Sequence, residues 1–308
     1  MKNTSDYFRH YSNVSTGFVT NSNWIILSSL EQKIKEKIEQ KSIPLRDWGV
    51  NIYRGILTGY NDAFIINPET RDKLIKSSSN SAEIIRPILR GRDIEKYVAK
   101  WNELYLITTF PSLQIDIDNF ETIKNYLLSF GIERLEQTGM SHIVNGVKII
   151  SRKKTTNKWF ETQDTIGYWK DFQQSKIIWK RIGSVLRFAY DDTGMLCLDS
   201  TCFAVGSDMK YLTGVLNSII LRKQLLANSP KTGTGDVITS VQALEPLLIP
   251  IVTESEKYKI EQLVDKAINI KLTNSLNDTS DVETEIDNIL FNLYGFSEEE
   301  KRYFINLD

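Results

Sequence analysis

The sequence is poor in the residues that bind metals or form disulfide bonds. Among 308 residues there are two cysteines, Cys197 and Cys202, and two histidines, His10 and His142. Two cysteines cannot build a disulfide framework or a four-thiolate zinc site. Neither histidine has acidic or cysteine neighbours at the spacing of metal ligands. We therefore expect two buried, reduced thiols and no metal site in this chain.

Long apolar runs and catalytic motifs are also missing. No window approaches the roughly 18 apolar residues of a membrane span, and the N-terminus, Met1 to Asp6, has no apolar signal core. The sequence contains no Gly-x-Gly-x-x-Gly or phosphate loop and no Asn-Pro-Pro-Tyr or Asp-Pro-Pro-Tyr element of an amino-methyltransferase. A convincing acidic pair with a spaced lysine, as in metal-dependent nucleases, is not found either. We expect a cytoplasmic protein without a membrane partner and without catalytic residues of its own.

The net charge of −1 hides an uneven distribution of charged residues. Residues 148–187 contain ten basic and three acidic residues, a balance of +7, whereas residues 253–308 contain six basic and thirteen acidic residues, a balance of −7. A positive stretch can face a polyanion such as nucleic acid, and a negative stretch cannot. A run of charge is also typical of an ordinary solvated surface, so other features have to decide.

Hydrophobic patterns predict a mixed α+β fold. Short β-branched and aromatic runs separated by turn residues fill the stretch from about 149 to 205, which indicates strands joined by loops. A strand, loop, strand unit is predicted around Asn51 to Arg54 and Ala63 to Ile66. Helical spacing occurs at 24–41, 209–228, 255–273 and 281–294, with Gly295 as the stop of the last helix.

A polar turn from Gly55 to Ile66 is not explained by the packing of an ordinary core. Its two glycines permit positive φ or a close approach of the backbone to something bulky, and Thr58 and Asn61 offer hydrogen-bonding side chains. A phosphate or a base edge could fit there. The alternative is a loop whose glycines serve only the turn.

Six segments in order along the chain resemble one known family. They are Trp24-Ile25-Ile26-Leu27 before a charged helix, Gly55 to Ile66, Arg86 to Ile94, Tyr168-Trp169 before Lys176 to Trp179, Tyr211 to Ser218, and Leu248 to Ile251. Together they resemble the target-recognition (specificity) domain of type IIG restriction-modification enzymes, the TaqI-like C-terminal specificity domain family. The resemblance implies a helical lead-in over residues 1–50, a β-rich target-recognition domain over 51–252, and a C-terminal helical segment over 253–308.

In that family the segment follows a DNA methyltransferase domain that binds S-adenosylmethionine and methylates adenine at N6, and often a nuclease domain. Neither precedes Met1. The resemblance therefore implies the specificity part alone, as a fragment or a separate subunit. Its expected partners are double-stranded DNA and a DNA methyltransferase, with a nuclease as a possible addition. S-adenosylmethionine and Mg²⁺ are expected only in the partner or the missing domains.

Recognition of a duplex needs cations for phosphates and side chains of fixed geometry for base edges. The stretch Ser151 to Lys158 is dense in such donors, and the alternation around Trp179 places nearby cations on a solvated face. The candidate DNA contacts are Thr58, Asn61, Arg90, Arg92, Arg152, Lys153, Lys154, Asn157, Lys158, Lys176, Lys180, Arg181, Lys231 and Thr232. For each the alternative is structural: a solvated loop, or for Arg90 and Arg92 an ion pair with Asp93 that orders its own loop.

Two other functions remain open at this point. The chain could be a protein-interaction subunit that docks on a methyltransferase through its acidic terminal helices. It could also be a nuclease whose acidic and lysine residues are too degenerate to recognise. The recognised DNA sequence cannot be read from the chain, because base readout depends on loop conformation and DNA shape.

Overall fold

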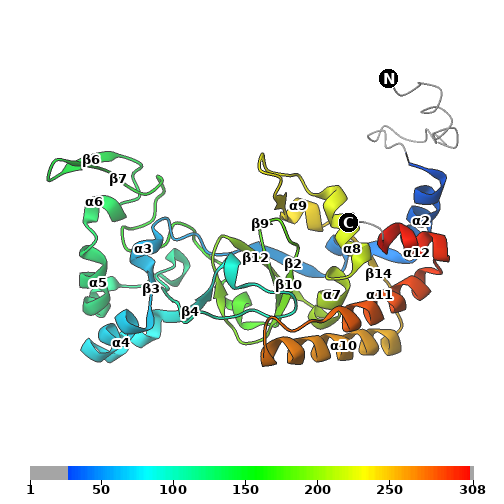
Figure 1. Ribbon diagram of the computed structural model, residues 1–308. Coiled ribbons are helices and arrows are strands. Elements are labelled where there is room, and N and C mark those ends of the chain that lie inside the picture. Colours follow the sequence, from blue (N-terminus) through cyan, green and yellow to red (C-terminus); the bar gives the residue numbers. More distant parts are fainter. Residues whose placement is uncertain (1–26, 306–308) are drawn as a thin grey trace, which may run out of the picture.

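The computed structural model describes residues 27–305, which form an elongated molecule around a central antiparallel sheet (Figure 1). The strand order in this sheet is β10-β8-β12-β2. Its strands are β2 (Val50–Arg54), β8 (Lys176–Lys180), β10 (Phe188–Asp191) and β12 (Thr201–Gly206). A predicted apolar segment, Trp24 to Ile26, and His10 lie outside the described residues.

Side chains from the two faces of the central sheet enter two separate hydrophobic cores. In β8, Ile177 and Trp179 pack into one core, whereas Ile178 between them packs into the other. In β12, Ala204 packs into the first of these cores and Phe203 into the second. Alternate residues of a strand point to opposite faces, so a sheet buried on both faces is apolar at nearly every position. The central sheet therefore joins the two lobes of the molecule.

The first lobe contains a second sheet with the strand order β11-β4-β5-β3, packed against short helices. Its strands are β3 (Ile65–Ile66), β4 (Ile85–Leu89), β5 (Tyr105–Ile107) and β11 (Leu196–Cys197). Its helices are α3 (Asn61–Phe64), α4 (Pro68–Ser77), α5 (Glu121–Leu128) and α6 (Ile132–Leu135). A hairpin of β6 (Ser141–Val144) and β7 (Val147–Ile150) projects from the far end of this lobe (Figure 1).

The second lobe is mainly helical. Its helices are α2 (Ser29–Gln40), α7 (Met209–Leu216), α8 (Ile219–Asn228), α9 (Val241–Leu244), α10 (Glu254–Thr273), α11 (Ser280–Tyr294) and α12 (Glu298–Ile305). Two small sheets pair β1 (Ser42–Pro44) with β14 (Leu248–Pro250) and β9 (Ile182–Gly183) with β13 (Val237–Ile238). Short 3₁₀ helices occur at Leu45–Asp47, Ser79–Ile84, Gly91–Asp93, Pro111–Leu113, Ile117–Phe120 and Trp169–Gln173.

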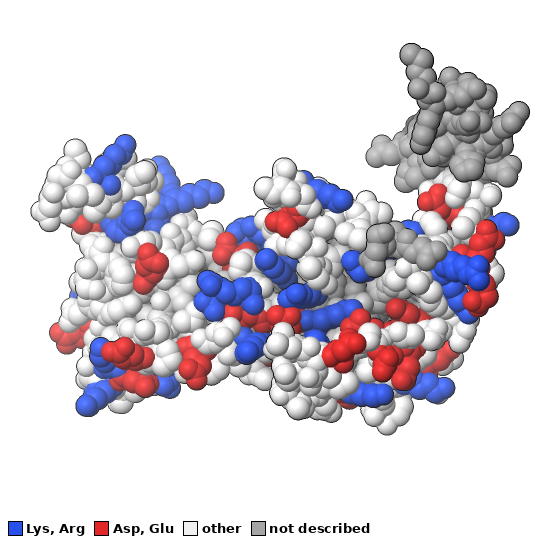
Figure 2. Space-filling model, in the orientation of Figure 1, with Lys and Arg blue, Asp and Glu red and all other residues white. Residues whose placement is uncertain are grey.

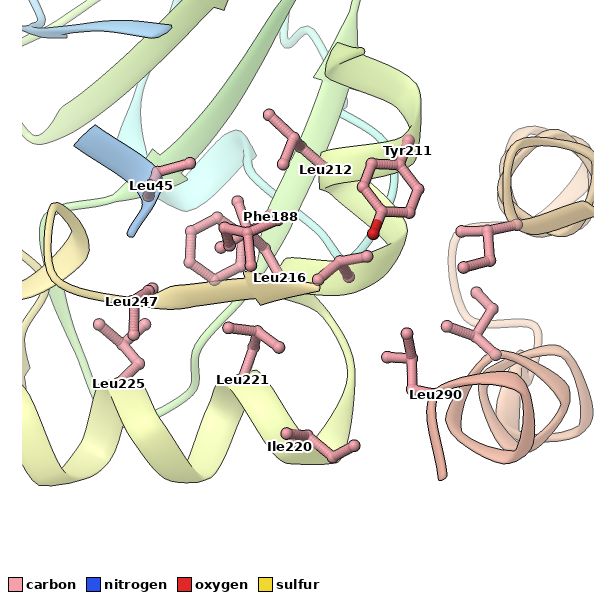
Figure 3. Packing of buried hydrophobic residues seen from close by; sticks show 14 of the residues in the cluster. Leu45, Phe188, Tyr211, Leu212, Leu216, Ile220, Leu221, Leu225, Leu247 and Leu290 are labelled. Atoms are coloured by element: carbon pink, nitrogen blue, oxygen red, sulfur yellow. The ribbon is translucent and has the colours of Figure 1, made fainter. Parts of the chain in front are cut away.

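Figure 3 shows how leucines from several elements of the second lobe meet in its core. Leu216 of α7, Leu225 of α8 and Leu290 of α11 are all buried there. Ile34 of α2 belongs to the same core, so residues from all three predicted parts of the chain share it. The division at residues 50 and 252 stays a prediction.

The predicted α+β class is confirmed, as are the helix stop at Gly295 and the two buried, free thiols. Ser28 caps α2 by accepting a hydrogen bond from the backbone N–H of Glu31 at 3.2 Å. Gly295 ends α11 in the left-handed conformation, with φ of 64°. Cys197 and Cys202 are free and buried, and burial raises the pKa of these thiols to about 12 and about 11 respectively.

Other predicted elements differ from the structure. The single helix expected over 209–228 is two helices, because the hydroxyl of Ser218 caps a new start by accepting a hydrogen bond from Leu221. The strand expected over Ala63 to Ile66 is one turn of α3 followed by two residues of β3. The β6–β7 hairpin and α12 were not predicted.

Lys176 is buried, which corrects the prediction that it lies on a solvated face and touches DNA. Its ammonium group contacts the carboxylate of Asp191 on the neighbouring strand β10 and donates to the carbonyl oxygen of Phe172 at 2.7 Å. The side chain is 0% exposed. Alternation holds in β8, but both faces of this sheet are covered at Lys176, and only Lys180 at the end of the strand is exposed.

Removal of one partner from this ion pair would leave a buried charge without compensation. Lys176→Met should therefore lower the free energy of unfolding by about 3–5 kcal/mol. Lys35→Met is the matched control, because Lys35 and Glu39 form a pair that is half exposed, and it should change stability by less than about 1 kcal/mol. Urea unfolding measures both variants, and equal losses would contradict the structural role of Lys176.

Candidate nucleic-acid interface

Arg152 is the centre of a buried hydrogen-bond network in the first lobe. Its guanidinium donates five hydrogen bonds to carbonyl oxygens: two to Leu135 (2.8 and 2.6 Å) and one each to Thr58 (2.9 Å), Glu161 (2.7 Å) and Trp159 (2.6 Å). The residue is 4% exposed, and burial lowers the pKa of Arg152 to about 10, partly offset by Glu161. All five donors of the guanidinium are used inside the protein. The prediction that Arg152 touches DNA directly is therefore corrected.

Gln137 forms a second buried centre, against residues 151–164, which we call the basic loop. Its amide nitrogen donates to the carbonyl oxygens of Lys158 (3.1 Å) and Glu161 (3.0 Å), and its amide oxygen accepts from the hydroxyl of Thr155 (2.7 Å). The amide nitrogen of Asn157 donates to two further carbonyl oxygens of the loop, at 3.2 and 3.0 Å. Both amide hydrogens of Asn157 are therefore used within the loop, so Asn157 has no free donor for the edge of an adenine base.

Three of the four exposed residues of the basic loop are lysines, and the fourth is Thr156. Lys153, Lys154 and Lys158 point away from the Arg152 network and are exposed. The ammonium group of Lys158 lies 5.5 Å from the ring centroid of Phe160. Because the backbone beneath them is fixed by buried hydrogen bonds, these cations are held on a rigid support.

The turn that begins at Gly55 is mainly part of this support. A Cβ atom at Gly55 would lie 2.0 Å from the carbonyl oxygen of Leu198, so glycine is needed for a close backbone approach. Gly59 has φ of +79°. Thr58 is fully buried, and its hydroxyl donates to the amide oxygen of Asn61 at 2.6 Å. The prediction of Thr58 as a DNA contact is corrected, whereas Asn61 is exposed and stays a candidate.

Two predicted contacts meet in a pocket over the central sheet. Arg92 and Lys180 line a cavity of about 140 Å³, which we call the central pocket. The stem of Lys180 crosses Gly91 and Gly183 so closely that an added Cβ at either glycine would lie 3.2 Å from it. The other residues lining the pocket are Ile94, Ser184, Val185 and Arg187. Its size and cations suit a single phosphate group.

The loop between α8 and β13 lies next to this pocket. Lys231 pairs through a bridge with Val237, and Val237 pairs with Gly183 at the pocket wall. Lys231 is exposed, and Arg181 is partly exposed. The hydroxyl of Thr232 accepts a hydrogen bond from the backbone N–H of Asp236 at 3.0 Å, which closes its own turn.

Arg90 has the structural role that the sequence left open. Its guanidinium donates to both carboxylate oxygens of Asp93, at 3.1 and 3.0 Å, and Asp93 is 1% exposed. Asn102 donates to the same carboxylate at 2.8 Å. A bidentate pair of this kind orders the loop that precedes the central pocket, so Arg90 positions the loop and Arg92 extends from it.

Lysine and arginine gather in two places on the face shown in Figure 2: beneath the projecting hairpin and over the middle of the molecule. The surface is hollowed between the hairpin and the loop between α8 and β13, which project to the same side (Figures 1 and 2). Lys153, Lys154 and Lys158 belong to the basic loop, and Arg92 and Lys180 line the central pocket, so the remaining predicted cations form two separate groups.

The β6–β7 hairpin next to the basic loop was missed from the sequence. Its turn is Asn145-Gly146, with φ of 50° and 79°, and alternating apolar residues flank it. Asn-Gly between two such runs is a strong hairpin signal because both residues tolerate positive φ. That signal was present and would have located the element.

Two negative findings concern residues 27–305. Within this range no three His, Cys, Asp or Glu side chains come together as a metal site. None of the helices in this range combines the length and the apolar character that crossing a membrane requires.

The fold is similar to that of known structures. The chain superposes on the type IIL restriction-modification enzyme MmeI, solved in complex with DNA, with a TM-score of 0.57 and 11% identity, over 86% of this chain and 36% of that one. The type IIG restriction endonuclease BpuSI matches with a TM-score of 0.47 and 14% identity, over 86% of this chain and 32% of that one. The chain thus spans about a third of each structure.

The fold is therefore one that occurs in restriction-modification enzymes. The sequence profile of the TaqI-like C-terminal specificity domain matches residues 86–247, more than half of the chain. The chain belongs to this family, as the six segments predicted. No curated protein matches it in sequence. The matched range contains the basic loop, the hairpin and the lining of the central pocket.

Arg152→Met keeps the volume of the side chain but removes every hydrogen bond of the network. It should lower the free energy of unfolding by about 3 kcal/mol, because four carbonyl groups lose a buried donor. Amide exchange at Gln163, whose N–H donates to Thr58, should accelerate before global unfolding. Arg46→Met, at an exposed site, is the control and should stay within about 0.5 kcal/mol. Unchanged exchange at Gln163 in the Arg152 variant would contradict the role of this network.

Proposed function

We propose that the chain is a sequence-specific double-stranded DNA recognition module of a restriction-modification system, without catalytic residues of its own. One observation carries the proposal: in a member of a specificity-domain family, the Arg152 network presents Lys153, Lys154 and Lys158 on a rigid loop. Cations held in a fixed arrangement can match the spacing of phosphates and set the register of a duplex. The fold shared with MmeI, a DNA-bound enzyme, is consistent with this role.

The two groups of cations would bind different parts of the DNA backbone. The basic loop would track one stretch of backbone, and Arg92 and Lys180 in the central pocket would hold a single phosphate some distance away. Arg181 and Lys231 would add weaker contacts at the edge of the pocket. Asn61 would add a contact beside the basic loop. Contacts at two separated places fix the orientation of a duplex, which contacts at one place do not.

A DNA adenine-N6 methyltransferase, as a domain or a subunit, would be the partner that acts on the recognised site. It would hold S-adenosylmethionine, and an associated nuclease would hold Mg²⁺. The acidic helices α10, α11 and α12 suit this partner better than DNA, because residues 253–308 carry a charge balance of −7.

The salt dependence of binding tests the proposal. Each phosphate that a lysine neutralises should contribute about −0.9 to the slope of log K against log salt concentration. Replacement of Lys153, Lys154 and Lys158 together by alanine should therefore make the slope shallower by about 2.7, as measured by fluorescence anisotropy with a duplex of random sequence.

The matched control replaces Lys33, Lys35 and Lys259, which are equally exposed but lie on the helices of the second lobe. This variant should keep the slope of the unmodified chain. DNA binding that does not depend on salt concentration would contradict the proposed interface. The same reduction of the slope in both variants would also contradict it. Incubation with plasmid and Mg²⁺ addresses the nuclease alternative, and we expect the plasmid to stay intact.

A further inference from the structure

The β6–β7 hairpin concentrates exposed apolar side chains. Of the twelve large hydrophobic residues that are exposed within residues 27–305, four lie in or beside this hairpin: Met140, Ile143, Val147 and Ile150. Ile143 is 82% exposed and Ile150 57% exposed. Single exposed apolar residues are ordinary, but a cluster on one projecting element marks a contact surface.

One face of the hairpin is open along its whole length. In the antiparallel register Ser141 faces Ile150, and Ile143 faces Lys148, so these four side chains share a face. All four are exposed. This outer face is two strands wide: Ile150 lies opposite Ser141 near the base, and Ile143 lies opposite Lys148 nearer the turn.

The base of the hairpin is fixed to the basic loop. The backbone N–H of Gly139 donates to Arg152 (2.9 Å), and the N–H of Ser151 donates to Met140 (2.9 Å). The pairing continues at Arg152, whose N–H donates to Glu136 (2.9 Å). The hairpin and the lysines of the loop are therefore one rigid unit, because the same strands run from the Arg152 network to the tip.

The charge around the hairpin indicates which kind of partner its exposed apolar face can bind. Residues 137–160 contain five basic residues and no acidic residue. Glu136, the acidic residue just before this stretch, lies on the opposite face of the hairpin, where its carboxylate is 3.9 Å from the imidazole of His142. A mainly basic surround favours the approach of DNA, because carboxylates repel phosphates and cations attract them, whereas an apolar docking site for another protein does not require it. The observations therefore favour a duplex over a protein surface.

Resting on the proposed function, we propose that the β6–β7 hairpin enters the major groove and that Ile143 and Ile150 pack against the 5-methyl groups of thymines. A two-stranded ribbon fits the major groove, which is about 12 Å wide, and not the minor groove of about 6 Å. The thymine methyl group is the apolar feature displayed there. Lys148, on the same face, reaches a guanine edge or a phosphate.

Uracil in place of thymine tests this contact, since it removes only the methyl group. The full chain first selects duplexes from a random pool, and the selected duplex is then made with thymine or with uracil. Binding should weaken roughly fourfold for each contacted methyl group. In Ile143→Ala and Ile150→Ala the preference for thymine should shrink, and thermal unfolding should be unchanged because both side chains are exposed.

Leu276→Ala is the control, since Leu276 is 88% exposed but lies beyond α10, and it should keep the full preference. Equal binding of thymine and uracil duplexes by the unmodified chain would overturn the hairpin contact while salt-dependent binding still supports the proposed function. A preference that survives in both isoleucine variants, with loss of binding to a purified partner methyltransferase, would overturn it in favour of a protein contact. Failure of the unmodified chain to bind any duplex would overturn both proposals.

Discussion

The candidate interface depends on one buried guanidinium. Five hydrogen bonds from Arg152 join the glycine turn, the end of α6 and both ends of the basic loop, segments that are up to 94 residues apart in the chain. No carboxylate accepts a hydrogen bond from it, so carbonyl oxygens are its hydrogen-bond partners, and desolvation lowers the pKa of Arg152, with Glu161 partly offsetting this shift. A cation that seemed suited to DNA instead fixes the backbone from which other cations extend.

The central sheet plays a comparable part on a larger scale. Because its two faces belong to different cores, it fixes the first lobe with the basic loop relative to the second lobe. The buried pair of Lys176 and Asp191 lies within this sheet, and the central pocket lies beside β8, where Lys180 ends the strand. The spacing between the basic loop and the pocket is therefore set by packed strands and not by flexible linkers.

The sequence was sufficient for the features that depend on local patterns. The α+β class, the stop at Gly295 and the family follow from hydrophobic periodicity, turn chemistry and ordered motifs. It was insufficient for the burial of Arg152 and Lys176, because Thr58, which accepts from Arg152, and Asp191, which pairs with Lys176, lie on other segments that only the fold brings close. Lys153 and Arg152 are neighbours with the same charge, yet one is exposed and the other buried.

The anchored base and open tip of the hairpin bear on how such a domain changes over evolutionary time. Exposed side chains of the hairpin contribute little to folding, so their replacement costs within about 0.5 kcal/mol, whereas backbone hydrogen bonds at the base fix the hairpin to the basic loop. New combinations of residues at the tip can then be sampled without loss of the fold. A chain built in this way can diversify by substitution at a few surface positions while the scaffold that holds them is inherited intact.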